Sequence, residues 1–145
     1  MISSERWRNN WLLVAPTGAV RIDLGRATGW HRDRKQTVRD LPPGTRVIVC
    51  AAAPAAGWRC RRFASDAGLE LEREYLAFPS VASPAYLVED ASATIDIFVK
   101  TVLVTPPRAA CATVIETCLG VLRAWHPSRL IRAIAPGRVV VGRRP

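Results

Sequence analysis

The sequence predicts an α/β fold in a single domain, on the basis of three observations. Residues 46–51 form a compact, mostly β-branched run of the kind found in a strand that is covered on both faces. A helical pattern of apolar residues follows this run, and an alternating pattern follows the helix. Strand and helix patterns therefore alternate along 145 residues, a length that suits one ordinary domain, residues 1–145.

The segments before the central strand are short. Residues 11–15 and 19–24 are apolar and flank the turn-forming sequence Pro16-Thr17-Gly18, so we expect two short strands around a turn. Residues 30–40 are charged and fit a helix that ends before a pair of prolines. Residues 1–10 are polar and mixed in charge, which is typical of a flexible terminus.

The middle of the chain predicts a helix followed by a strand. Four apolar residues at helical spacing give the helix one buried face, and Gly68 is a suitable left-handed terminator; the four are Cys60, Phe63, Ala64 and Ala67. Apolar and charged residues then alternate over 71–78, which predicts a strand with one wetter face. Pro79 ends this strand, because proline lacks the donor that a sheet ladder needs.

The last third predicts helices and a final strand. Residues 94–104 fit either element, and we favour a helix. Residues 108–124 show an unbroken amphipathic pattern, and a short helix is expected over 128–135. Residues 135–144 predict a turn and a last strand with basic residues on its exposed flank.

Composition limits the classes of function. The net charge is +9, but 19 of the 21 basic residues are arginine and they are spread along the chain, so the charge is not by itself a nucleic-acid signal. There is no apolar run of transmembrane length and no export signal, so we expect a cytoplasmic protein without a membrane partner. The four cysteines lack zinc-ligand spacing; we expect buried free thiols and no metal site.

Three phrases in residues 36–144 carry a resemblance to a known family. They are Leu41-Pro42-Pro43-Gly44-Thr45-Arg46-Val47-Ile48-Val49, Ala67-Gly68-Leu69 and Ala77-Phe78-Pro79. In this order they resemble the second half of a class I S-adenosylmethionine-dependent methyltransferase. The resemblance implies a partial Rossmann-like sheet with a helical insertion before the last strand. It also implies that the half that binds the cofactor is degenerate or absent.

The best cofactor candidate is the segment 23–29, which resembles the glycine-rich loop of that family. Asp23, Gly25 and Gly29 match the loop, and they would bind S-adenosylmethionine if the cofactor is used. Arg26 and Ala27 depart from the pattern, and residues 30–45 are too few for the rest of such a site. The cofactor expectation is therefore that none is bound.

Other candidate sites are few, and no catalytic residue can be named. Arg59, Arg61 and Arg62, beside Trp58, could bind an anion or a nucleic acid, although a solvated helix face is the favoured interpretation. His31 and His126 are the only histidines, and both are expected to be structural or solvated.

The resulting hypothesis is a truncated methyltransferase-like protein that is not catalytic alone. Half of such a sheet leaves an open edge near residues 19–24, so we expect a homo-oligomer or an accessory subunit of a biosynthetic enzyme. The alternatives are a minimal S-adenosylmethionine-dependent methyltransferase and a basic nucleic-acid-binding module.

Overall fold

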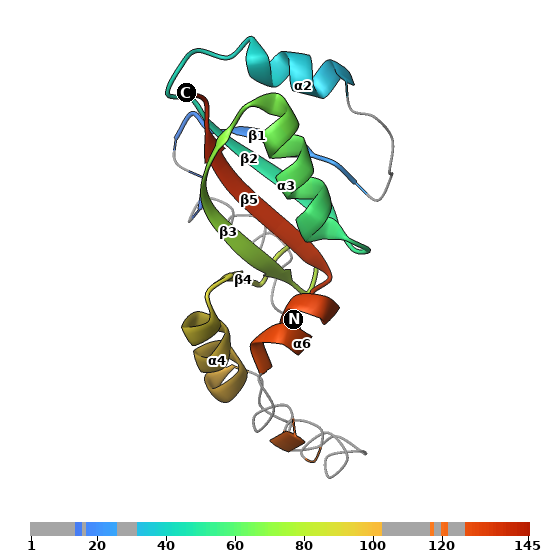
Figure 1. Ribbon diagram of the computed structural model, residues 1–145. Helices are drawn as coiled ribbons and strands as arrows, with labels where there is room; N and C mark the ends of the chain where they lie inside the picture. Colours follow the sequence, from blue (N-terminus) through green and yellow to red (C-terminus); the bar gives the residue numbers. More distant parts are fainter. Residues whose placement is uncertain (1–13, 16, 26–31, 103–116, 118–119, 122–126) are drawn as a thin grey trace. The chain divides into compact units, whose positions relative to one another are not determined.

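The computed structural model describes residues 14–15, 17–25, 32–102, 117, 120–121 and 127–145. It confirms the α/β class: an open, mixed five-stranded sheet is combined with several helices (Figure 1). The chain forms two compact units. The first comprises residues up to Leu87 together with Ala135–Pro145, and the second comprises Val88–Ile134.

The strands and helices follow the predicted order. The strands are β1 (Val20–Asp23), β2 (Arg46–Ala52), β3 (Glu70–Phe78), β4 (Tyr86–Glu89) and β5 (Gly137–Arg143). The helices are α2 (Arg32–Arg39), α3 (Ala56–Ala67), α4 (Ser92–Thr101) and α6 (Pro127–Ile134). The sequence predicted all of these except β4, which follows the proline that ends the strand predicted over 71–78.

The last strand enters the middle of the sheet. The strand order is β1-β2-β5-β3-β4, with β1 parallel to β2 and β5 antiparallel to both β2 and β3. Among the described strands, β1 is the terminal one on one side, as the sequence predicted. A bulge between Leu71 and Arg73 shifts the register of β3 against β5, so the two residues need not follow strict alternation.

The sheet of the first unit has a core on each face. On one face the central valines, such as Val47, Val49 and Val140, pack with the apolar side of α3, which crosses this face (Figure 1). On the opposite face Ile48 and Val139 pack with Val81 and with loop residues. The central strands are therefore buried on both sides, which explains their continuous apolar sequence.

Helix α3 ends where its sequence predicted. Gly68 adopts a left-handed conformation with φ of 74°, and its N–H donates to the carbonyl of Ser65. At the other end Ala55 is also left-handed, with φ of 53°, which costs more for alanine than for glycine. The connection between β2 and α3 is therefore a tightly constrained turn.

The second unit contains the helical insertion that precedes the last strand. Ile95 and Val99 of α4 and Ile131 of α6 are buried, and the two helices pack against each other. An ion pair joins Arg132 to Asp90. Residues 94–104 therefore adopt the helix that we favoured, up to Thr101.

One predicted strand is wrong in the part that the structure describes. Val14 and Ala15, the end of the expected strand 11–15, lie in a turn and a bend. Their apolar side chains pack against the sheet face that carries Ile48, so tertiary packing explains the apolar pattern that we interpreted as a strand. The terminus 1–10 and most of the predicted helix 108–124 lie outside the described residues.

Candidate functional site

The first candidate region is the carboxyl end of β1, where Asp23 and Gly25 lie. Gly25 has a φ of 58°, and its N–H donates to Asp23 Oδ1 at 2.8 Å. The Asp23 carboxylate thus closes a turn of its own backbone, a common local role for aspartate. Gly29, the third residue of the predicted loop, lies outside the described residues.

Arg59 occupies the space between the ends of β1 and β2. Its side chain is buried, with a relative exposure of 8%. Nη2 donates to the Leu24 carbonyl at 3.0 Å, and Nη1 lies 3.3 Å from the Ala52 carbonyl. In open α/β sheets, ligands bind outside the carboxyl ends of the parallel strands. Here a side chain of the protein itself ties those two strand ends together.

The other two arginines of the predicted anion site point elsewhere. Arg61 forms a bidentate pair with Glu74 of β3, at 2.7 and 2.8 Å. The Arg62 guanidinium lies 5.1 Å from the centre of the Trp58 ring, a cation–π distance. The three residues are close in sequence, but each guanidinium contacts a different group: backbone carbonyls for Arg59, Glu74 for Arg61 and Trp58 for Arg62. The structure therefore does not bring them together at one anion.

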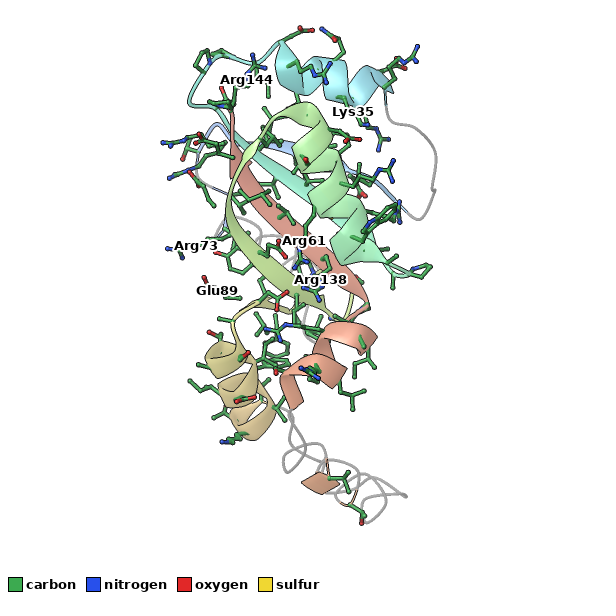
Figure 2. The ribbon with its side chains drawn as sticks, in the orientation of Figure 1. Lys35, Arg61, Arg73, Glu89, Arg138 and Arg144 are labelled. Atoms are coloured by element: carbon green, nitrogen blue, oxygen red, sulfur yellow. The ribbon has the colours of Figure 1, made fainter. Side chains whose placement is uncertain are left out.

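A buried cation that the sequence did not reveal lies on β5. Arg138 has a relative exposure of 9% and borders Gly57, where an added Cβ would meet its Nε at 3.5 Å. Figure 2 shows it between β5 and α3. We had placed the basic residues of this segment on an exposed flank. The sequence contained the information needed to predict this burial: Arg138 lies two residues before the apolar Val140, and residues two apart in a strand point to the same face.

The cysteines of the described region are structural. Cys50 and Cys60 are buried free thiols, as predicted. Burial raises the pKa of Cys60 to about 12. Burial also raises the pKa of Cys50, and a hydrogen bond from Arg21 offsets part of that rise. Both groups stay protonated near neutral pH and are poor nucleophiles or metal ligands. Within the described residues no cluster of His, Cys, Asp or Glu could hold a metal ion.

Many basic side chains of the described surface face a specific acceptor. Ion pairs join Lys35 to Asp66, Arg46 to Glu72, Arg61 to Glu74, and Arg143 to both Glu70 and Glu72. The Lys35 ammonium, 2.6 Å from Asp66 Oδ2, lowers the pKa of that carboxyl. Arg144 donates to the carbonyl oxygens of Val38 and Arg39 at the end of α2 (Figure 2). Many of the basic side chains are thus engaged in ion pairs and hydrogen bonds within the protein.

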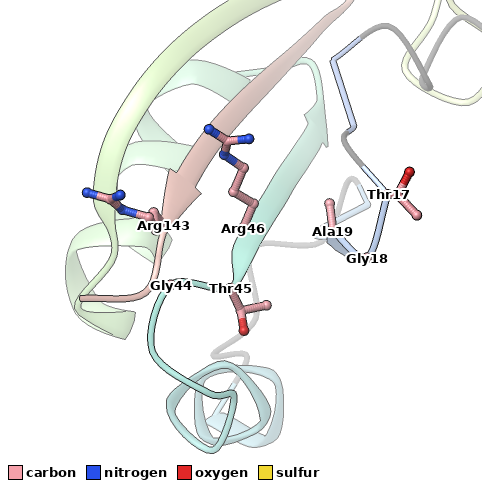
Figure 3. Close-up of a pocket in the computed structure, with 7 residues that line it drawn as sticks. All are labelled: Thr17, Gly18, Ala19, Gly44, Thr45, Arg46 and Arg143. Atoms are coloured by element: carbon pink, nitrogen blue, oxygen red, sulfur yellow. The ribbon is translucent and has the colours of Figure 1, made fainter.

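A pocket lies at the opposite end of the sheet, at the amino ends of β1 and β2. It has a volume of about 320 Å³ and is lined by the turns that precede β1 and β2, together with Arg46 and Arg143 (Figure 3). None of the residues proposed from the sequence as a cofactor or anion site lines it.

Comparisons with known proteins return no relative. No protein-family model, curated protein or solved structure matches the chain. Among the helices that the structure describes, none is both long enough and apolar enough to span a bilayer. Inference about function therefore rests on the fold and on the contacts described above.

Proposed function

We propose that this protein is a methyltransferase-like scaffold that does not transfer methyl groups on its own. It would act in a homo-oligomer or as an accessory subunit of a biosynthetic enzyme. The observation that carries the proposal is the strand order β1-β2-β5-β3, with the final strand antiparallel between two strands that are parallel to each other. Such an order is typical of the second half of a class I methyltransferase sheet.

The region around the strand ends supports the absence of a cofactor. The Asp23 carboxylate is engaged by the Gly25 N–H, and the Leu24 carbonyl accepts a hydrogen bond from Arg59. A glycine-rich loop binds a ligand through backbone groups that are exposed to it. In the described part of this loop, two of the polar groups serve contacts within the protein, which favours a scaffold over a minimal methyltransferase.

The terminal position of β1 supports action through a partner. Residues of a strand direct their backbone groups alternately to the two sides, and the Leu24 N–H donates towards β2, to the carbonyl of Cys50 at 2.8 Å. By this alternation the N–H of Asp23 points to the side away from β2. A partner strand that pairs along this side would extend the sheet, which is a common way to cover an edge.

Calorimetric titration with S-adenosylmethionine and S-adenosylhomocysteine tests the non-catalytic part of the proposal. We expect no heat of binding at millimolar ligand. Micromolar affinity for either ligand would overturn this part and would favour the minimal methyltransferase, with Asp23 and Gly25 at the cofactor.

Sedimentation of the purified chain over a wide concentration range tests the homo-oligomer. We expect self-association that is weakened by Asp23→Pro, because proline removes the N–H on the outer side of β1 while leaving the donors to β2. Circular dichroism of the variant provides the control for folding. Association that is unaffected in a folded Asp23→Pro variant would place the interface elsewhere, and a strict monomer would remove the homo-oligomer.

A further inference from the structure

The pocket at the amino ends of β1 and β2 has the construction of a small-ligand site. Its volume of about 320 Å³ is at the lower end of the range for ligand pockets. It lies at the end of the sheet opposite Asp23 and Gly25, so it is separate from the loop considered above. The lining residues are Thr17, Gly18, Ala19, Gly44, Thr45, Arg46 and Arg143 (Figure 3).

Two glycine turns leave the backbone bare on one side of this pocket. Gly18 and Gly44 have φ angles of 86° and 82°, a region in which other residues are strained. A Cβ added at either position would meet no atom within 4 Å. The Gly44 N–H donates to the Arg144 carbonyl at 2.8 Å, which fixes its turn against the end of β5. The turn at Gly44 is therefore held in place, and there is open space beside both glycines.

Two arginines line the same pocket from neighbouring strands. Arg46 and Arg143 are direct cross-strand partners on β2 and β5, and they share the face that points away from α3. Like charges in directly opposite positions repel each other unless an anion lies close to both. Figure 3 shows the two side chains next to each other, with the Arg143 guanidinium directed away from the turn that carries Thr17 and Gly18.

The Glu72 carboxylate, on the neighbouring strand β3, is one anion that lies close to both arginines. Its two oxygens lie 3.1 Å from Arg46 Nε and 3.9 Å from Arg143 Nε. Glu70 lies 3.4 Å from Arg143 Nη2. A guanidinium has five N–H groups, so these contacts use only part of the donor capacity of each arginine. Both side chains remain about half exposed, at 49% and 52%.

We propose that this pocket binds a small oxyanion of the phosphate or phosphate-monoester class. The terminal nitrogens of Arg46 and Arg143 would hold its oxygens, because a guanidinium matches phosphate geometry with two parallel hydrogen bonds. Two guanidinium groups on neighbouring strands can each contact different oxygens of one tetrahedral dianion, and a planar carboxylate offers only two oxygens and a single charge.

Titration with inorganic phosphate at constant ionic strength, balanced with sodium chloride, tests the proposal by calorimetry or amide chemical shifts. We expect saturable binding that weakens at least tenfold in Arg46→Gln and in Arg143→Gln. Glu72→Gln should bind phosphate more tightly than the unmodified chain, because it removes the anion that now competes for both arginines. Acetate at the same ionic strength should bind more weakly than phosphate.

Arg61→Gln is the matched control. Arg61 is also paired with a glutamate and its side chain is 56% exposed, but it lies on α3 and does not line the pocket. An equal loss of phosphate affinity in Arg61→Gln would overturn the site in favour of diffuse charge attraction, and a lack of saturable binding would overturn it outright. Equal affinity for acetate would overturn the assignment to phosphate. Thermal unfolding of each variant shows whether a loss of binding reflects a loss of fold.

Discussion

Among the described glycines, Gly137 has the least room for a side chain. A Cβ at this position would lie 1.8 Å from Val81 Cγ2 and 3.3 Å from the Ala51 carbonyl oxygen. No methyl group fits at 1.8 Å from Val81 Cγ2, so the Val81 side chain or the backbone that carries it has to move. We expect Gly137→Ala to lower the free energy of unfolding by roughly 2 kcal/mol or more, the usual scale for overpacking a core. Urea denaturation measures this change.

Two further variants separate overpacking from the general effect of replacing glycine. Gly120 is helical and an added Cβ there meets nothing within 4 Å; Gly120→Ala should therefore leave stability unchanged or raise it by up to about 1 kcal/mol. Val81→Ala should restore part of the loss when combined with Gly137→Ala, because the two changes act on the same contact. Simple additivity of the two losses would contradict the steric explanation.

The thiol of Cys60 links stability to alkaline pH. Burial raises its pKa from 9.0 to about 12 in the folded state. Between these two values the unfolded chain loses the proton while the folded chain keeps it, so stability falls as pH rises, by at most about 1.4 kcal/mol per pH unit from this group. Its full contribution is present below pH 9. Urea denaturation between pH 8 and 11 should show a shallower decline in Cys60→Ala than in the unmodified chain, and equal slopes would contradict the assignment.

At the scale of elements, α3 contacts the ends of β1 and β2 through Arg59 and pairs with Glu74 of β3 through Arg61. Replacing Arg59 by methionine keeps much of the apolar stem but leaves the carbonyls of Leu24 and Ala52 without its donors. We expect a loss of roughly 1–3 kcal/mol, the cost of an unsatisfied buried polar group. Arg61→Met removes an exposed ion pair and should cost at most about 1 kcal/mol.

Thermal and urea unfolding of the two variants measure this difference directly. The comparison is matched, because both arginines lie on one helix two positions apart and both substitutions are the same. If Arg61→Met cost as much as Arg59→Met, the tie between the ends of β1 and β2 would not be the reason for the loss.

The elements themselves were largely predictable, because their signals are local. Helical spacing of apolar residues identified α3, alternation identified β3, and Gly68 marked the end of a helix. The hydrogen bonds of Arg59 were not predictable, because the acceptor carbonyls of Leu24 and Ala52 belong to two other segments that only the folded sheet brings together. Val14 and Ala15 misled for the same reason: an apolar pair can be buried by tertiary packing without forming a strand.

At the scale of the molecule, the sheet order could not be read from the pattern of elements. The sequence indicates that a strand follows the helical insertion, but not that β5 pairs with both β2 and β3. That pairing joins Arg46 to Arg143 and Glu70 to Arg143 across long sequence separations. The proposed phosphate pocket depends on the pairing of β5 with β2, because this pairing places Arg143 beside Arg46. A site of this kind is visible only after the register of the strands is known.

The division into two units predicts that the sheet folds without the helical insertion. Among the residues that the structure describes, every member of its two core clusters belongs to the first unit. Replacing Val88–Ile134, which includes the last two residues of β4, by a flexible linker of about 20 Gly and Ser residues, with an end-to-end distance of roughly 25 Å, should therefore retain the strands β1, β2, β5 and β3. The shorter loop should also lower the entropy cost of bringing β5 between its neighbours.

We expect this shortened chain to unfold in a single cooperative transition and to keep the strand signal in circular dichroism. Gly137→Ala introduced into it should cause the same loss of stability as in the full chain, because Val81 and Ala51 are both retained. A shortened chain without a cooperative transition would show that the insertion is required for the sheet core. A cooperative chain that tolerates Gly137→Ala would show that β5 no longer lies in its native register.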